Sequence, residues 1–331
     1  MANSTKLKRY SPLKKGEIKM ISCTEFIPCY SELFTYLEEK NGREEVNRFW
    51  KYLFKPDGEG IPLINYVNRE GIRGCFSYWA GTLNEEAADF TMYLNEKAGW
   101  FLLEMHHCPS KGRLLKLKDE IGIVPYHDYC QHCDSYRSAV EKIGLKYIYN
   151  FADCGHAACS ILIYDPAVFD GRVIVNKETE IMDRKASQNE YFHRDFHSSM
   201  NMGIEYIGEH YGLAGVKEFL TKYTEHVYKP VIAAMKANGL SALRAKIEDT
   251  YRKEKAADVL TLEQDANSLH VAVRECPAVR HLHDTGRIVS KWYRYTTEYV
   301  MAALAEQGGF RFTMEAYDEA TGAASYRFEA E

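Results

Sequence analysis

Three short segments in the first half of the chain carry most of its reactive side chains. They read His106-His107-Cys108-Pro109, Tyr129-Cys130-Gln131-His132-Cys133 and Asp153-Cys154-Gly155-His156-Ala157-Ala158-Cys159. The C-x-x-C spacing of the middle segment places two thiols on one turn, an arrangement that soft metals and redox centres use. If the three segments pack at one end of a sheet, their sulfur and imidazole groups converge. We therefore expect metal binding or nucleophilic thiol chemistry at this place.

The cysteines are distributed very unevenly. Eight of the nine precede residue 160, and only Cys276 follows it. The chain opens with no secretion signal, so we expect it to be cytoplasmic. In a reducing compartment, clustered Cys and His residues indicate metal or thiol chemistry rather than disulfides. For Cys154 and Cys159 a plainer interpretation stays open, because free cysteines are often small buried core residues.

The second half of the chain carries a different pattern, on a helix predicted over residues 191–211. His193 and His197 lie four residues apart on one face, Asp195 lies between them, and Glu190 precedes them by one turn. Such a pair can chelate a metal, or it can hold one imidazole as a base whose tautomer a carboxylate fixes. A helix start with exposed histidines is the alternative.

Both patterns occur in a chain whose two halves resemble each other in sequence. NEEAADFTMYL (84–94) matches KEKAADVLTLE (253–263), and FLLEMHHCPSKGRL (101–114) matches LHVAVRECPAVRHL (269–282). The offset stays between roughly 165 and 170 residues, as a tandem duplication predicts. The second copy keeps only Cys276 of the thiols, so the fold itself does not require the others. The first copy has no counterpart of the histidine pair.

In each copy, helical spacing of apolar residues is followed by the alternation typical of strands, and this order predicts an α+β fold. We expect two tandem repeats, 1–170 with the Cys/His cluster and 171–331 with the His193/His197 helix, paired with pseudo-two-fold symmetry. Each repeat is expected to be a helical bundle followed by a small antiparallel sheet that carries one further helix. In the first copy the predicted helices lie near 29–40, 43–54, 62–80 and 126–143, and the strands near 87–94, 100–107, 145–151 and 158–164, with 165–188 as the connection.

The overall composition indicates which classes of binding partner the protein has. The net charge is −5 with both signs interspersed, so no basic field is available for nucleic acid. No apolar stretch approaches the roughly 20 residues of a membrane span. We expect a small-molecule substrate, no nucleic acid and no membrane. Pairing within one chain and pairing between chains in a homo-oligomer both stay open.

The motifs together resemble a known family. A helix bundle is followed by a strand ending in Cys108-Pro109, a helix entered by Cys130 to Cys133, Gly144-Leu145, and a hairpin that closes over Gly155 to Cys159. This order resembles the L-2-amino-thiazoline-4-carboxylic acid hydrolase-like proteins. The His193-x-Asp195-Phe196-His197 helix is similar to the start of such units. Both copies carry the resemblance, although the second departs at every Cys position except Cys276. The resemblance implies ring-opening hydrolysis of a cyclic amidine.

We therefore expect a hydrolase of C–N bonds with one site assembled from both repeats. In a metal-assisted form, zinc or iron would lower the pKa of its bound water toward about 7. In a thiol form, Cys108 or Cys130 would attack the substrate carbon. Sequence alone does not choose between the two. The predicted metal ligands are His106, Cys108, Cys130, Cys133 and His197, and the predicted catalytic residues are Cys108, His132, His193, Asp195 and His197.

Two other classes of function stay open. A non-catalytic sensor could hold a metal or small ligand with the same residues. A redox or lyase enzyme could use the same Cys/His cluster.

Overall fold

The computed structural model describes residues 8–10, 26–54, 61–85, 88–185 and 196–330. The chain divides into two compact units. Unit 1 comprises Met1–Ile21, Arg43–Lys116 and His127–His193, and unit 2 comprises Ser22–Gly42, Leu117–Tyr126 and Arg194–Glu331. The units thus differ from the repeat ranges, because helix α1 (Phe26–Asn41) belongs to unit 2 and strand β6 (Glu180–Arg184) belongs to unit 1.

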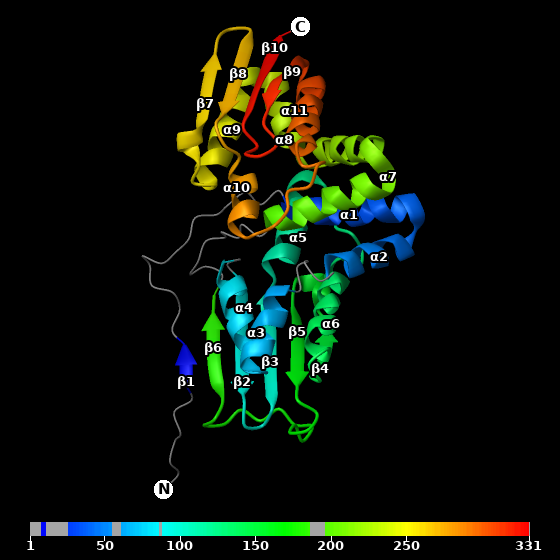
Figure 1. Cartoon of the computed structure of the whole chain (residues 1–331), viewed down its shortest axis with the longest axis vertical. Helices are drawn as coiled ribbons and strands as arrows, with labels where there is room; N and C mark the ends of the chain where they lie inside the picture. Colours follow the sequence, from blue (N-terminus) through cyan, green and yellow to red (C-terminus); the bar gives the residue numbers. More distant parts are fainter. Residues whose placement is uncertain (1–7, 11–25, 55–60, 86–87, 186–195, 331) are drawn as a thin grey trace. The chain divides into compact units, whose positions relative to one another are not determined.

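Unit 1 is built on a six-stranded sheet with the order β1-β6-β2-β3-β5-β4 (Figure 1). Neighbouring strands are antiparallel except for β1 and β6, which are parallel. Strand β3 pairs with β5, with Met105 opposite Cys159 at the end nearest the reactive segments. The remaining strands are β1 (Lys8–Tyr10), β2 (Asp89–Asn95), β3 (Trp100–His107), β4 (Lys146–Asn150) and β5 (Cys159–Tyr164).

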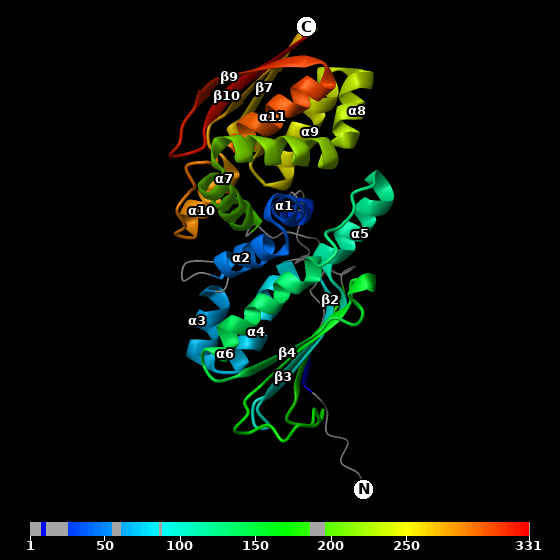
Figure 2. The ribbon, with the colours of Figure 1, turned by 90° about the vertical axis from the view of Figure 1, so that its right-hand side faces the viewer.

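Helices cover one face of this sheet. Alternate strand residues such as Phe90, Met92 and Phe101 point to that face and are fully buried, as the two-residue period of a strand requires. Trp79 stacks on Phe101 with ring centroids 5.6 Å apart, and burying one such side chain contributes about 1.5–3 kcal/mol. Figure 2 shows the covering helices from the side. These are α3 (Ile61–Glu70), α4 (Arg73–Glu85) and α6 (Arg137–Glu141).

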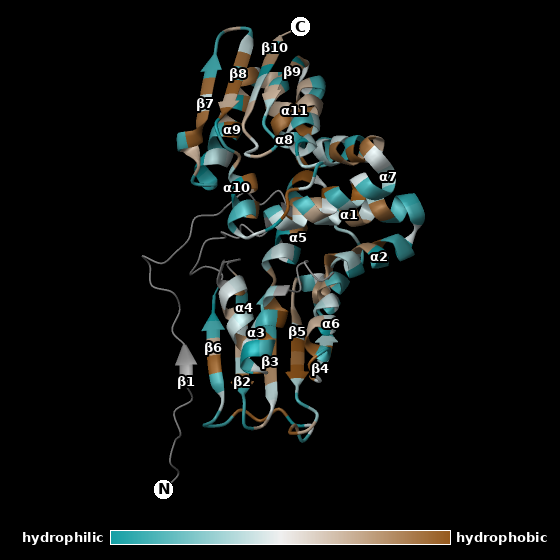
Figure 3. Cartoon of the chain, viewed as in Figure 1, coloured by the Kyte–Doolittle hydropathy of each residue, from teal (hydrophilic) through white to brown (hydrophobic). Residues whose placement is uncertain are grey.

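Two further helices frame the reactive segments of unit 1. One is helix α2 (Arg43–Leu53), which is mostly hydrophilic. Figure 3 shows this helix beside the more apolar strand β5 of the sheet. Helix α5 (Pro109–Ile121) begins directly after Cys108, and its residues from Leu117 onward belong to unit 2. Pro109 suits the first helical position because that residue has no intrahelical partner for its N–H.

Unit 2 has a four-stranded antiparallel sheet with the order β7-β8-β10-β9. The order repeats that of β2-β3-β5-β4 in unit 1, strand for strand. Its strands are β7 (Leu260–Gln264), β8 (Ser268–Val273), β9 (Phe310–Tyr317) and β10 (Ala324–Ala330). Its helices besides α1 are α7 (Phe196–Val227), α8 (Lys229–Asn238), α9 (Leu240–Lys253), α10 (Pro277–Asp284) and α11 (Tyr295–Gly308).

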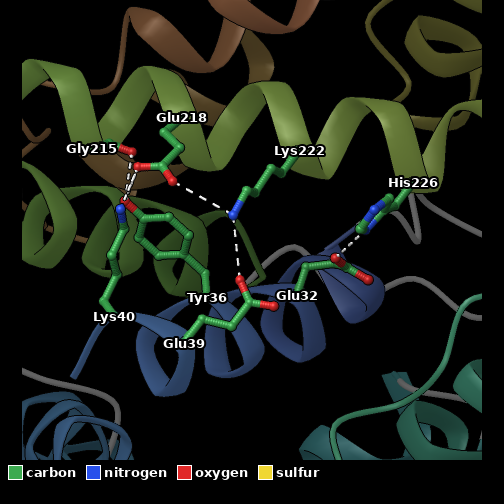
Figure 4. Close-up of polar contacts among 8 residues, drawn as sticks. All are labelled: Glu32, Tyr36, Glu39, Lys40, Gly215, Glu218, Lys222 and His226. Atoms are coloured by element: carbon green, nitrogen blue, oxygen red, sulfur yellow. Dashed lines mark hydrogen bonds and ion pairs between the residues drawn. The ribbon is translucent and has the colours of Figure 1, made fainter. Parts of the chain in front are cut away.

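Helix α1 packs against α7 within unit 2, and polar side chains line their contact (Figure 4). The Tyr36 hydroxyl lies 3.3 Å from both the Gly215 carbonyl and a Glu218 carboxylate oxygen. Lys40 Nζ lies 2.6 Å from the same Glu218 oxygen. Further along, Lys222 pairs with Glu39 at 3.3 Å, and His226 pairs with Glu32 at 2.8 Å.

The predicted α+β class is confirmed, but several elements differ from the sequence-based prediction. The helix predicted over 62–80 is two helices, because Gly71 adopts φ 60° and ends the first. The helix predicted over 126–143 is a 3₁₀ helix over Tyr129–Tyr136 followed by the short α6. Strand β6 lies inside the segment predicted as a connection. Helices α5 and α10, each after a Cys-Pro pair, were not predicted.

Glycines with positive φ mark where helices break in both halves. Gly212 (φ 65°, ψ −170°) interrupts α7, as its place at the end of a predicted helix indicates. Gly42 (φ 72°) separates α1 from α2 in the same manner. None of the helices within the described residues is both long and apolar enough to span a membrane.

Candidate functional site

The three reactive segments of the first half meet in unit 1. They enter from the end of β3, from the 3₁₀ helix over Tyr129–Tyr136 and from the turn before β5. The backbone N–H of Cys108 donates to the Ala157 carbonyl at 2.7 Å and ties the first segment to the third. Five thiols lie close enough to influence one another or the same tyrosines. We name them the thiol cluster: Cys108, Cys130, Cys133, Cys154 and Cys159.

At its centre, Cys130 and Cys154 affect each other's ionisation. A hydrogen bond from Cys130 lowers the pKa of Cys154 to about 7, because it stabilises a Cys154 thiolate. The same bond, together with burial, raises the pKa of Cys130. Of the two thiols, Cys154 is therefore the one that loses its proton first.

Two other groups support the charge on Cys154. The ammonium of Lys111, on the first turns of α5, attracts it, and the hydroxyl of Tyr149 on β4 donates a hydrogen bond to it. Asp153, the preceding residue, opposes it. Tyr149 also hydrogen-bonds with Cys159, whose pKa burial raises to about 12. The Tyr149 hydroxyl thus has two sulfurs, those of Cys154 and Cys159, to which it can donate its single proton.

The second thiol of the C-x-x-C turn is paired with an imidazole. Cys133 Sγ lies 3.5 Å from His132 Nε2. The other ring nitrogen, Nδ1, faces the Tyr129 carbonyl, which can only accept. Nδ1 must therefore carry the hydrogen, and Nε2 of the neutral ring is left to accept the proton of the Cys133 thiol. A thiol beside a base that a third group orients is the arrangement of an activated nucleophile.

Charged and aromatic side chains fix the 3₁₀ helix that carries these residues. Arg43 at the start of α2 donates to Gln131 at 2.9 Å and pairs with Asp128. The Tyr147 hydroxyl donates to the Cys133 carbonyl at 3.1 Å, and the Tyr147 carbonyl accepts from the Arg137 guanidinium. The helix is thus tied both to α2 and to the sheet.

Cys108 has a structural contact that distinguishes it from the other thiols. The backbone N–H of Lys111 donates to its sulfur at 3.5 Å, as an N-terminal helix cap does. Cys276 stands at the same place before α10, close to the N–H groups of Ala278 and Val279. A position at the start of a helix is thus what Cys108 and Cys276 share.

His106 lies at the end of β3, where it hydrogen-bonds with Thr91 rather than with a thiol. Its Nε2 lies 2.8 Å from Thr91 Oγ1, and that hydroxyl lies 3.2 Å from Asp183. The next residue, His107, packs over Gly112 in α5. A Cβ added to Gly112 would lie 2.2 Å from Nε2 of His107.

The predicted histidine pair of the second half is only partly within the described residues. His193 and Asp195 lie outside them. His197, in unit 2, is almost wholly buried and donates from Nε2 to Glu254 at 3.2 Å. The His281 ring lies 6.0 Å away between centroids. The site shared by both repeats stays a prediction.

The predicted metal centre needs at least three donor side chains close together. Across the part of the chain that the structure describes, no three His, Cys, Asp or Glu side chains are grouped so as to hold a metal ion. The cysteines in that part are all free thiols. Zinc or iron at the thiol cluster stays a prediction.

Sequence reasoning missed three contributors. Cys154 lies in one of the three segments predicted to converge, but it is not among the predicted site residues, because a core role stayed open for it. Lys111 lies on a helix that Pro109 could have signalled, since proline favours the first helical turn. Tyr149 shares a strand face with Tyr147, which the two-residue period predicts. Comparison of the chain with family models, curated proteins and solved structures finds no match.

Proposed function

We propose that this protein is a hydrolase that opens a C–N bond of a small cyclic amidine, with Cys154 as the nucleophile. The observation that carries the proposal is the lowered pKa of Cys154, which Cys130, Lys111 and Tyr149 all depress. Three such groups favour a thiolate at neutral pH, and the thiolate is the reactive form of cysteine. The substrate class comes from the resemblance of the motifs to L-2-amino-thiazoline-4-carboxylic acid hydrolase-like proteins.

The proposed reaction has two halves. In the first, the Cys154 sulfur forms a bond to the amidine carbon, and the ring C–N bond breaks. The leaving nitrogen takes a proton from the Cys133–His132 pair. In the second half, water attacks the same carbon, the C–S bond breaks, and the proton of water returns to the pair. The sum is one substrate and one water converted to one ring-opened product.

The proposal assigns different roles to the cysteines that the sequence singled out. Cys108 caps α5 and positions Lys111, Cys130 stabilises the thiolate, and Cys133 works with His132. Contributions from His193, Asp195 and His197 stay predictions.

We also propose a common origin for the two units. Their sheets share one strand order. Residues with left-handed φ, Ala157 at 61° and Gly322 at 66°, stand two positions before the matching strands β5 and β10. The pseudo-two-fold pairing of the repeats and a homo-oligomer remain proposals.

The test uses L-2-amino-thiazoline-4-carboxylate as the probe and mass spectrometry of the product. Wild type should give a product one water heavier and, in single turnover, a covalent adduct on Cys154. Cys154→Ser should lose at least about 100-fold in kcat/KM, consistent with removal of a nucleophile. Cys29→Ala, which changes a buried thiol in unit 2, should retain activity.

Other outcomes would contradict the thiol mechanism. Stoichiometric zinc or iron, with activity that chelators abolish and Cys154→Ser retains, would establish the metal-assisted form. Tight binding of the probe without any product would favour a sensor. Product formation with no change in Cys154→Ser would place the chemistry elsewhere.

A further inference from the structure

We propose that one face of the unit 1 sheet is a docking surface for a second copy of this chain. The face is the one that points away from α3, α4 and α6, which pack on the opposite side of the sheet (Figure 2). We name it the outer face. The inference assigns a surface to the homo-oligomer named with the proposed function, and it does not depend on the hydrolysis.

An unbroken row of apolar side chains crosses the outer face from strand to strand. Ile148 on β4 lies opposite Leu162 on β5, and Leu162 lies opposite Leu102 on β3. The row continues from Leu102 to Tyr93 on β2 and ends at Ile181 on β6. Ile148 is 50% exposed, and Leu162, Leu102 and Tyr93 are partly exposed, whereas Ile181 is buried. Side chains alternate between the two faces of a strand, so all five point away from the helices.

Unit 2 provides an internal comparison, because its sheet has the same strand order. The matching sequence segments place a polar residue at three positions of the row: Thr313 for Ile148, Arg327 for Leu162 and His270 for Leu102. The register agrees, since Thr313 lies opposite Arg327, and Arg327 lies opposite His270. An antiparallel sheet commonly has one face on the core and one face in water, as unit 2 does. The fold therefore does not require the apolar row of unit 1.

The loop between β5 and β6, residues 165–179, extends the apolar surface. Tyr164 follows Leu162 by two positions on β5 and points to the same face. The Phe169 ring of the loop lies 4.8 Å from the Tyr164 ring, measured between centroids. The loop exposes four aliphatic side chains: Val168, Val173, Ile174 and Val175. A continuous exposed apolar patch of this kind marks an interaction site.

The charges beside the patch favour a second copy as the occupant. Lys97 pairs with Glu178 at 2.9 Å, and Arg172 pairs with Asp170 at 2.8 Å. Because these charges are matched within unit 1, they do not select a partner of opposite charge and do not repel an identical chain. A two-fold axis would place the apolar row against itself, which is the self-complementary arrangement of an isologous dimer. Two sheets can pack face to face in this way at about 10 Å.

The experiment measures the mass of the full-length protein by sedimentation over a range of concentrations. Wild type should be a dimer that dissociates on dilution. The double variant Ile148→Thr/Leu162→Arg gives unit 1 the residues of unit 2, and it should weaken dimerisation at least about 100-fold, because it places like charges across the interface. Ile288→Arg is the matched control, since Ile288 is an apolar residue of unit 2 that is 85% exposed, and it should leave the dimer unchanged.

A second measurement does not depend on the folding of any variant. Wild-type copies with and without heavy isotopes are mixed and treated with a lysine cross-linker. Links between copies should involve Lys146, which lies two positions before Ile148 on β4, or Lys97 and Lys177 beside the loop. Thermal denaturation shows whether the double variant is folded, and the single variant Ile148→Arg, at a half-exposed position, replaces it if it is not.

Three results would overturn the inference: a wild type that is monomeric at every concentration, a folded double variant that dimerises as wild type does, or links between copies through unit 2 lysines alone. The first result would assign the outer face to an occupant other than this chain. The outcome is separate from that of the proposed hydrolysis. A dimer that opens no amidine leaves this inference standing, and a hydrolase that is always monomeric removes it alone.

Discussion

Cys130 and Cys154 are linked in their ionisation: a hydrogen bond from Cys130 lowers the pKa of Cys154 to about 7. The two residues belong to the 3₁₀ helix and to the turn before β5, and the 3₁₀ helix leads through α6 into β4, the neighbour of β5 in the sheet. The two thiols therefore differ in acidity, with the pKa of Cys154 lowered and that of Cys130 raised.

Alkylation of Cys154 should follow a titration with its midpoint at about 7, compared with 9.0 for an ordinary thiol. Removing the donor in Cys130→Ala destabilises the thiolate, so the midpoint should rise, although Lys111 and Tyr149 still favour the charge and Asp153 still opposes it. Because each pKa unit is tenfold in thiolate fraction below the midpoint, the rate at pH 7 should fall by roughly tenfold. Peptide-level labelling with iodoacetamide measures this rate.

The control for this titration is Cys29→Ala, whose Cys154 profile should match that of wild type. A wild-type midpoint near 9, or a Cys130→Ala profile with an unmoved midpoint, would show that the hydrogen bond does not set the charge.

The turn that presents Cys154 contains a strained residue. Ala157 adopts φ 61° and is buried, whereas unit 2 has Gly322 with φ 66° at the matching place. The left-handed region costs an L-residue about 1–2 kcal/mol, and glycine escapes this cost while it loses some backbone entropy. Ala157→Gly should therefore raise the free energy of unfolding by about 0.5–1 kcal/mol. Urea denaturation measures the change.

The reverse substitution in unit 2 supplies the matched control. A Cβ on Gly322 would lie 2.5 Å from the Cys276 Cβ, so Gly322→Ala should destabilise the protein. If Ala157→Gly also destabilises, then the turn does not store the strain assigned to it.

Part of the site could be predicted from the sequence, because it follows from the order of strands. Cys108 follows one strand directly and Cys159 begins its neighbour, so their segments had to converge once β3 paired with β5. The charge on Cys154 could not be predicted, since it depends on which side chains face one sulfur. Lys111 does so through a helix that periodicity did not reveal. Likewise, Glu254 meets His197 only after packing of α7 and α9 brings distant residues together.

Two glycines of α4 should respond oppositely to the same substitution. A Cβ on Gly74 would lie 2.4 Å from the backbone carbonyl of Tyr66 in α3, whereas a Cβ on Gly81 meets nothing within 4 Å. Gly74→Ala should therefore destabilise by about 1–3 kcal/mol through overpacking, because backbone cannot move aside. Gly81→Ala should stabilise by up to about 1 kcal/mol through helix propensity. Thermal denaturation of both variants provides the comparison, and equal shifts would refute the close approach of α3 to α4.

The pairing of α1 with α7 in unit 2 should depend on Tyr36 more than on the ion pairs beside it. The Tyr36 ring is 3% exposed, and its hydroxyl shares one proton between the Gly215 carbonyl and Glu218 (Figure 4). Burial and the Glu218 charge raise the pKa of Tyr36, so the hydroxyl stays a donor throughout the stable pH range. Tyr36→Phe removes that donor and leaves the Gly215 carbonyl without it, at a cost of about 0.5–1.5 kcal/mol.

Lys222 offers the matched comparison on the same interface, because its pairs with Glu39 and Glu218 are half exposed. Exposed ion pairs contribute about 0–1 kcal/mol and are screened by salt. Lys222→Ala should therefore change stability less than Tyr36→Phe does, and 1 M NaCl should erase its effect but not that of Tyr36→Phe. Urea denaturation at low and high salt distinguishes the two. A larger loss for Lys222→Ala, or a Tyr36→Phe effect that salt removes, would mean that charge rather than the buried hydroxyl holds α1 on α7.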